Sequence, residues 1–130
     1  MDTREVVDSY YRLANAGDWD AWSDLFAADQ VMDEQLAGHI EGRETLRTMM
    51  KGFPDMYASF ANRPKHIVVD GDRAAVVSHI SAVTSSGGRI EADVANYFQV
   101  SGGRITYMAN FHDTVPFRAA LAPATGGENP

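Results

Sequence analysis

Apolar positions near the start of the chain recur at the spacing of one helix face. Asp2 and Glu5 can cap the start of this helix, and Gly17 ends it. The apolar stripe comprises Val6, Tyr10, Leu13 and Ala14. The pattern therefore predicts a first helix that packs one face against a core.

A second helix is expected directly after the first. Asp18 is a suitable N-cap residue, and an apolar stripe follows it. That stripe consists of Trp22, Leu25 and Phe26. A short extended piece is predicted over residues 31–36, and Gly38 and Gly42 bracket a predicted turn.

The third helix has the clearest helical periodicity. Its apolar residues occur at i, i+3, i+4 and i+7 and are Leu46, Met49, Met50 and Phe53. Pro54 kinks or ends this helix, because proline has no backbone N–H to donate. Beyond it, the apolar face can continue through Met56, Tyr57 and Phe60.

After Pro64 the pattern changes to strands that are separated by short turns. The predicted strands cover residues 65–69, 74–84, 89–100 and 104–112. Glycine-containing turns at this spacing are typical of an antiparallel meander. Three helices followed by such a meander predict an α+β fold, with the helices covering one face of the sheet.

Asn96 interrupts the apolar face of the strand over residues 89–100. The same face carries Ile90, Ala92, Val94, Phe98 and Val100. Burying an unpaired amide costs about 1–3 kcal/mol, so Asn96 needs a partner. Two interpretations stay open at this point: an amide satisfied within the core, or a donor that lines a pocket.

The last predicted strand has two partly apolar faces. One carries Ile105, Tyr107, Ala109 and Phe111, and the other carries Thr106, Met108, Asn110 and His112. Periodicity alone turns the first face toward the core. In the strand over residues 74–84, His79 lies opposite the apolar face, which favours a structural or interfacial role.

Asp33 and Glu34 lie between two apolar segments. If this segment is a strand, the two carboxylates face opposite sides and only one points inward. A carboxylate in an apolar pocket has a raised pKa, which suits proton transfer near neutral pH. The alternative is a pair of solvated acids in an exposed loop.

Composition and charge exclude several classes of function. The formal net charge of −7 leaves no basic face for a nucleic acid or an anionic membrane. The chain has no cysteine, which rules out disulfides and thiolate chemistry. His39, His66, His79 and His112 are not at metal-binding spacing, so we expect no metal and no cofactor.

The length of 130 residues fits a single domain, which we expect over residues 1–121. Residues 122–130 are rich in proline and glycine, and we expect a disordered tail there. The charged N-terminus does not resemble a signal peptide, and no apolar run is long enough to span a bilayer. A cytoplasmic location is the expectation.

Several segments together resemble the ketosteroid isomerases and SnoaL-like polyketide cyclases of the nuclear transport factor 2-like superfamily. They are 10–18 (YYRLANAGD), 25–29 (LFAAD), 42–46 (GRETL), 98–105 (FQVSGGRI), and Asp113 with Pro116 and Phe117. The second of these segments is similar to the end of the superfamily's second helix. The resemblance covers about residues 4–121 and implies a cone-shaped, barrel-like fold in which three N-terminal helices and a curved sheet enclose one pocket.

The resemblance also implies roles for particular residues. The proton-shuttling base falls on Glu34, within one residue of Asp33, and the oxyanion tyrosine falls on Tyr10. The oxyanion acid falls on Asn96, where an amide replaces the carboxyl group, so steroid isomerisation itself is not implied. The pocket-lining positions of the last strand fall on Met108, Asn110 and His112.

We therefore expect a cofactor-independent enzyme, a cyclase or isomerase acting on an apolar, polyketide-like or isoprenoid-like carbonyl compound. Glu34 or Asp33 is the expected base, and His112 a second acid or base. The expected oxyanion donors are Tyr10, Asn96 and Asn110. The side chains expected to shape the pocket are Trp22, Phe53, Phe60, Val94, Phe98 and Met108.

The alternatives are a non-catalytic small-molecule binding protein, a dehydratase with His112 or His79 as its base, and an epoxide hydrolase. The last is disfavoured because the Asp–Arg–Asp set of limonene-epoxide hydrolases is not found. The resemblance turns the face of Ile105, Tyr107 and Phe111 outward, where a homodimer interface is expected.

Overall fold

The computed structural model describes residues 1–121, and the predicted disordered tail lies outside the described residues. The helices are α1 (Thr3–Ala16), α2 (Trp19–Ser23), α3 (Arg43–Met50), α4 (Phe53–Met56) and α5 (Val115–Leu121). The strands are β1 (Phe26–Glu34), β2 (Gly38–Glu41), β3 (Tyr57–Asp70), β4 (Arg73–Thr84), β5 (Arg89–Ser101) and β6 (Arg104–Phe111).

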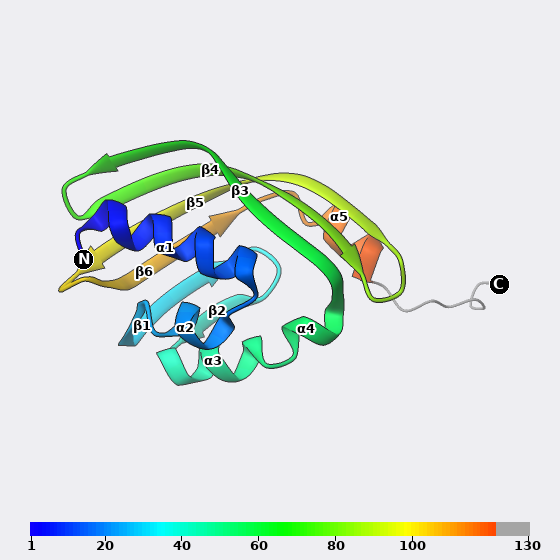
Figure 1. Cartoon of the computed structure of the whole chain (residues 1–130), viewed down its shortest axis with the longest axis horizontal. Helices are drawn as coiled ribbons and strands as arrows, with labels where there is room; N and C mark the ends of the chain where they lie inside the picture. Colours follow the sequence, from blue (N-terminus) through cyan, green and yellow to red (C-terminus); the bar gives the residue numbers. More distant parts are fainter. Residues whose placement is uncertain (122–130) are drawn as a thin grey trace.

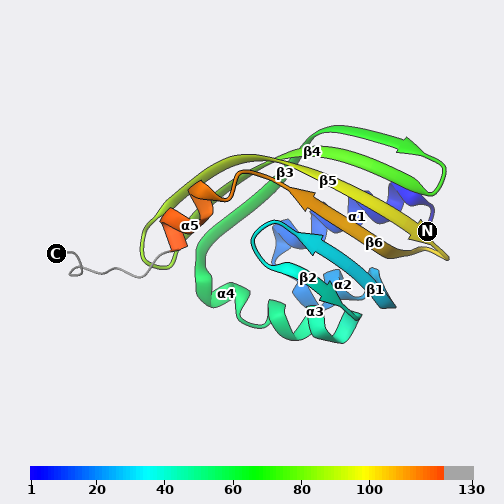
Figure 2. The ribbon, with the colours of Figure 1, turned by 180° about the vertical axis from the view of Figure 1, so that it is seen from behind.

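The strands form one six-stranded sheet in the order β2-β1-β6-β5-β4-β3. Neighbouring strands are antiparallel except for β1 and β6, which run parallel. Figure 2 shows β6 between β5 and the short pair of β1 and β2. The predicted α+β class with a mostly antiparallel sheet is confirmed, and the sheet is curved but not closed into a barrel.

Helix α1 lies across the concave side of the sheet, with α2, α3 and α4 on the same side (Figure 1). As predicted, Asp2 and Glu5 form a capping box at its start, and Gly17 ends it with a φ of 71° in the left-handed region. Its buried face includes Val6, Val7, Tyr10, Tyr11 and Ala14. These side chains pack on β4, β5 and β6 and form the centre of the main core.

The helical stripe predicted through Leu25 and Phe26 was wrong, as was the likeness of segment 25–29 to a helix end. Helix α2 ends at Ser23, and Phe26 begins β1. The backbone N–H of Ile105 donates to the carbonyl of Leu25 at 2.8 Å, and Phe26 is fully buried. Pairing with β6 buries these apolar residues in the sheet, where a helix would leave the end of β6 unpaired.

The turn predicted between Gly38 and Gly42 is instead the edge strand β2, which pairs antiparallel with β1. The helical continuation through Tyr57 and Phe60 is also replaced by a strand, since β3 begins at Tyr57. Pro54 lies in the first turn of α4, a position where its missing N–H costs no helical hydrogen bond.

The two faces of β6 are separated as the resemblance implied, with one exception. Phe111 is exposed on the outer face, whereas Ile105 is fully buried in the core. A register shift between β5 and β6 lies next to Ile105, between the Gln99 and Val100 pairings. This irregularity reverses the alternation, so Ile105 shares the inner face with Met108.

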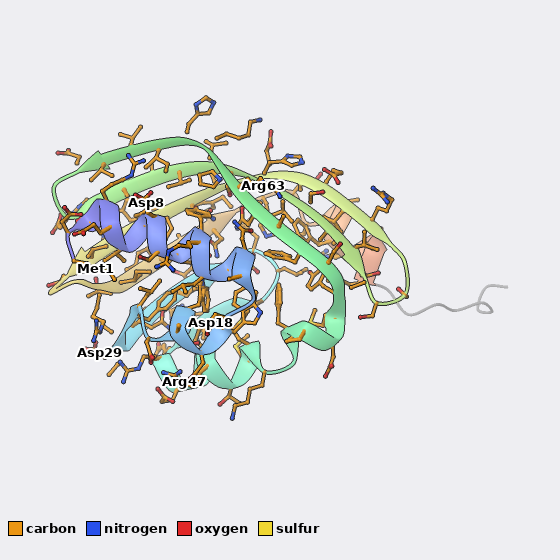
Figure 3. The ribbon with its side chains drawn as sticks, in the orientation of Figure 1. Met1, Asp8, Asp18, Asp29, Arg47 and Arg63 are labelled. Atoms are coloured by element: carbon orange, nitrogen blue, oxygen red, sulfur yellow. The ribbon has the colours of Figure 1, made fainter. Side chains whose placement is uncertain are left out.

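Helix α3 is held against α2 by Arg47, which is labelled in Figure 3. Its guanidinium group forms ion pairs with Asp20 and Asp24 of the α2 region and with Glu44 one turn earlier. These ion pairs hold α3 beside α2, on the concave side of the sheet. No helix within residues 1–121 is long and apolar enough to cross a membrane.

Candidate active site

A cavity of about 220 Å³ lies between the helices and the concave side of the sheet. Its aromatic lining consists of Tyr10, Trp19, Trp22, Phe53, Tyr57, Phe60 and Phe117. Its polar side chains are Glu34, Asn62, Asn96, Asn110 and His112. No lysine or arginine of residues 1–121 lines it, so its charged or titratable groups besides the tyrosines are one carboxyl group and one imidazole.

Glu34 and His112 are in direct contact at the cavity wall. Nε2 of His112 lies 2.6 Å from Oε2 of Glu34. The side chain of His112 is 4% exposed and that of Glu34 is 18% exposed. The other carboxylate oxygen, Oε1, accepts the backbone N–H groups of Leu36 and Ala37 at 2.8 and 2.6 Å. The loop after β1 therefore fixes the Glu34 carboxylate from one side, and His112 fixes it from the other.

The second nitrogen of His112 determines the number of protons in this pair. Nδ1 lies 3.0 Å from the backbone carbonyl oxygen of Asp113, which can only accept, so Nδ1 carries a hydrogen. One further proton is then shared between Nε2 and Glu34. A carboxyl group and an imidazole joined by one hydrogen bond can pass a proton between them and exchange one with a ligand.

The strand geometry separates the two neighbouring acids, and Asp33 points to the outer face. Its carboxylate contacts Nδ1 of His39 at 2.6 Å and accepts the hydroxyl of Tyr107 at 2.7 Å. These two hydrogen bonds, with His39 first, hold the pKa of Asp33 below its usual range. Of the two candidate bases, Glu34 is the one that lines the cavity.

Tyr10 lines the cavity opposite the sheet. Burial, and then the negative charge of Glu34, raises the pKa of its hydroxyl, so this group stays protonated near neutral pH. Within the described part of the chain, no hydrogen bond satisfies this hydroxyl. Tyr10 is therefore a neutral donor available to a ligand.

Asn96 and Asn110 lie side by side, since they are direct partners in the pairing of β5 and β6. Nδ2 of Asn96 donates to Oδ1 of Asn110 at 2.6 Å. The hydroxyl of Tyr11 donates to Oδ1 of Asn96 at 2.6 Å. Both open interpretations of Asn96 thus hold in part, because its amide is satisfied within the protein and also borders the cavity.

Sequence reasoning missed Tyr11, although a signal was present. Val7 and Tyr11 are separated by four positions, which is helical spacing; they lie next to the predicted apolar stripe, and both are buried. It also missed Trp19, Tyr57 and Phe117 as lining residues. The ring of Phe117, from α5, lies with its centroid 4.6 Å from that of His112 and covers the imidazole.

The side chains expected to shape the pocket divide into two groups. Trp22, Phe53, Phe60 and Val94 line the cavity. Phe98 and Met108 do not, because both are fully buried in the core beneath α1. The ring centroids of Phe98 and Tyr10 are 5.1 Å apart, and the Tyr10 ring fills the space between Phe98 and the cavity.

His79 lies on the outer face of the sheet, away from the cavity. Its Nε2 contacts Glu91 at 2.7 Å and its Nδ1 contacts Asp93 at 2.8 Å. These hydrogen bonds, with that to Glu91 first, raise the pKa of His79. Among the residues described here, no group of three or more histidine and acidic side chains is arranged to hold a metal ion.

Several known proteins are similar to this chain in sequence or in structure. An uncharacterised PhzA/B-like protein of Pseudomonas aeruginosa is 28% identical in an alignment 128 residues long, and the match covers 93% of this chain and 91% of that protein. An NTF2-like protein of unknown function from Burkholderia pseudomallei has a TM-score of 0.85 at 15% identity, covering 94% of this chain and 98% of its own. SalBIII, described as an epoxide hydrolase/cyclase-like enzyme in pyran ring formation in the polyether salinomycin, has a TM-score of 0.75 at 23% identity, covering 85% of this chain and 90% of its own.

These structural neighbours establish an NTF2-like fold, and they include an epoxide hydrolase/cyclase-like enzyme. The SnoaL-like domain family matches residues 7–108, which run from within α1 into β6 and include the cavity lining except Asn110, His112 and Phe117. The chain belongs to the family of SnoaL-like domains.

Proposed function

We propose that this protein is a cofactor-independent acid–base enzyme that isomerises or cyclises a small apolar carbonyl compound. The observation that carries the proposal is the 2.6 Å contact between Glu34 and His112 in a cavity with a mainly apolar and aromatic lining. A carboxylate and an imidazole in contact, with limited access to water, are suited to moving a proton in both directions.

In the proposed reaction, Glu34 removes a proton from the carbon next to the substrate carbonyl. Oε2 has a lone pair left for this step, because His112 occupies only one direction at that oxygen. The resulting enolate oxygen receives hydrogen bonds from Tyr10 and Asn110, and one such donor is worth about 3–4 kcal/mol in the transition state.

The second proton transfer completes the reaction. For an isomerisation, the proton returns from Glu34 or His112 to a different carbon of the dienolate. For a cyclisation, the enolate carbon attacks a second carbonyl group of the same substrate, and His112 protonates the oxygen that becomes an alkoxide. In both cases the number of protons is conserved within the Glu34–His112 pair and the substrate.

The size and lining of the cavity indicate the substrate class. The volume of about 220 Å³ is below the roughly 300–1,000 Å³ of pockets for drug-sized ligands. The seven aromatic rings in its wall favour flat, apolar molecules. A compound of one or two rings with a carbonyl group matches both properties.

The test uses 2-tetralone, a two-ring ketone with acidic protons next to its carbonyl. Deuterium incorporation from D2O, followed by proton NMR, should be faster with the protein than with free acetate and imidazole at the same concentration. An equal rate would overturn the proposal. Binding of 2-tetralone without faster exchange would instead support a non-catalytic binding protein.

A dehydratase is the second candidate, because it requires a histidine that points inward beside an acid. His112 meets this condition next to Glu34, whereas His79 does not. With 3-hydroxycyclohexanone, Glu34 would remove the proton next to the carbonyl, and His112 would protonate the departing hydroxyl to give water and 2-cyclohexenone. The absorbance of the enone reports this reaction.

Epoxide hydrolysis has less support. Within residues 1–121, Glu34 is the single carboxylate that lines the cavity, and no arginine accompanies it. The Asp–Arg–Asp arrangement that activates water is therefore not available around this cavity.

We also propose that two copies of the chain pair through the outer face of the sheet. Val68, Val77 and Phe111 are exposed there, and Phe111 is 54% exposed. Exposed apolar side chains gathered on one face are typical of protein interfaces. Sedimentation should give a dimer for the wild-type protein and a monomer for Phe111→Glu, and a monomeric wild type would contradict this proposal.

A further inference from the structure

Asn110 stands at the end of a hydrogen-bonded chain that begins on α1, outside the cavity wall. The Tyr11 hydroxyl donates to Oδ1 of Asn96 at 2.6 Å, and the Ser78 hydroxyl donates to the same oxygen at 3.3 Å. Nδ2 of Asn96 then donates to Oδ1 of Asn110 at 2.6 Å. Each amide accepts on the side of α1 and donates toward the next group.

The direction of this chain is determined by Tyr11. Tyr11 is 3% exposed, and burial raises the pKa of its hydroxyl, so the group keeps its proton. If the amide of Asn96 were turned around, its NH2 group would face the hydroxyls of Tyr11 and Ser78, and both would lose the oxygen that now accepts from them. Each hydrogen bond contributes about 0.5–1.5 kcal/mol, and the shorter one, from Tyr11, contributes most to the observed direction.

Turning Asn96 around would also turn Asn110. Oδ1 of Asn96 would then face Asn110 and accept from its Nδ2, leaving Oδ1 of Asn110 as the free group. In the observed direction Nδ2 of Asn110 is the free group. Its one acceptor within the described residues is the weakly accepting Sδ of Met32, at 4.0 Å. The end of the chain that borders the cavity is therefore an N–H donor.

We propose that Tyr11 is a positioning residue that sets the hydrogen-bonding polarity of the cavity. Through Asn96 it makes Asn110 a donor, so the position beside Asn110 binds a ligand oxygen acceptor in preference to a ligand N–H donor. This deepens the proposed function, because a carbonyl or enolate oxygen is such an acceptor. It rests on that function only in taking the cavity as the ligand site.

The test compares two probes of similar size and opposite polarity. 1-Indanone has a carbonyl acceptor and no donor, whereas indole has an N–H donor and no comparable acceptor. Dissociation constants are measured by NMR titration, and the readout is their ratio. The wild-type protein should bind 1-indanone about five- to tenfold more tightly than indole, the effect of one hydrogen bond made or left unmade.

The Tyr11→Phe variant should reduce this preference to about twofold or less, because only the longer hydrogen bond from Ser78, at 3.3 Å, then favours the observed direction of the Asn96 amide. Tyr97→Phe is the matched control, since the same change is made on β5 outside the cavity wall, and it should keep the wild-type ratio. A role of Tyr11 in packing alone would weaken binding of both probes equally and leave the ratio unchanged. An unchanged ratio in folded Tyr11→Phe would overturn the inference.

A measurement on the wild-type protein stands even if Tyr11→Phe does not fold. Adding 1-indanone should shift the side-chain amide resonances of Asn110 more than those of Asn96, whose Nδ2 is already bonded. Shifts confined to Asn96, failure of 1-indanone to bind, or a preference for indole would each overturn the inference. None of these results depends on turnover. A failure of the proposed catalysis would be recognised separately, because deuterium exchange of 2-tetralone would then be no faster with the protein than with free acetate and imidazole.

Discussion

Nε2 of His112 lies 2.6 Å from Oε2 of Glu34, although 78 positions separate the two residues in the chain. The parallel pairing of β1 with β6 explains this contact. Glu34 is the last residue of β1 and is the register partner of Asn110, and His112 lies two residues beyond Asn110 on the same side. The ends of two adjacent strands therefore bring an acid, an amide and an imidazole to one position of the cavity wall.

The first prediction concerns the donor on α1. Tyr10→Phe should slow deuterium exchange of 2-tetralone about 100-fold or more, because one donor to the enolate oxygen is lost. The Michaelis constant should change little, since the donor acts mainly after charge has developed on the oxygen. Tyr97→Phe should leave the rate unchanged. A lower affinity at an unchanged maximal rate would assign Tyr10 to binding alone.

The second prediction separates core from cavity among the aromatic residues. Phe98→Ala should lower the free energy of unfolding by about 3–5 kcal/mol, because the fully buried ring leaves a void beneath α1. Phe53→Ala should cost less, since this ring is half-buried at the cavity wall, and should weaken binding of 1-indanone. Urea unfolding measures both costs, and equal costs would contradict the division.

The third prediction concerns the pH dependence of stability on the outer face. The pKa of His79 is raised by its hydrogen bonds to Glu91 and then Asp93. Its stabilising contribution is therefore complete below the unfolded pKa of about 6.5 and is lost as the pH rises through the higher folded value. The effect is small, because the group is exposed.

Urea midpoints at about pH 5.5 and pH 9 measure this effect. The midpoint of the wild type should fall more between these two conditions than that of His79→Gln. His66→Gln is the control, because His66 forms no side-chain hydrogen bond within the described chain and should behave as the wild type. Equal decreases in wild type and His79→Gln would contradict the prediction.

The long, regular elements of this fold could be predicted from the sequence. The capping box at Asp2 and the glycine at position 17 define α1, and the glycine turns separate β4, β5 and β6. The start of β1 could not be found, because Trp22, Leu25 and Phe26 also match helical spacing. Only the parallel pairing with β6, a contact between distant segments, decides between the two structures.

The candidate site was predictable in its residue types more than in its contacts. Strand alternation establishes that Asp33 and Glu34 face opposite sides, but which of them points inward depends on pairing with both β2 and β6. The role of Tyr11 depends on a contact across 85 positions, to Asn96. The inward turn of Ile105 follows from a register shift that alternation cannot predict.

The most direct test of the central claim compares the two neighbouring carboxylates of β1. Deuterium exchange of 2-tetralone is measured for the wild type, Glu34→Gln and Asp33→Asn, with unfolding curves to verify that all three are folded. Glu34→Gln should lower the catalysed rate about 100- to 10,000-fold, and Asp33→Asn should keep it within about twofold. Full activity in Glu34→Gln, or a larger loss in Asp33→Asn, would contradict the account.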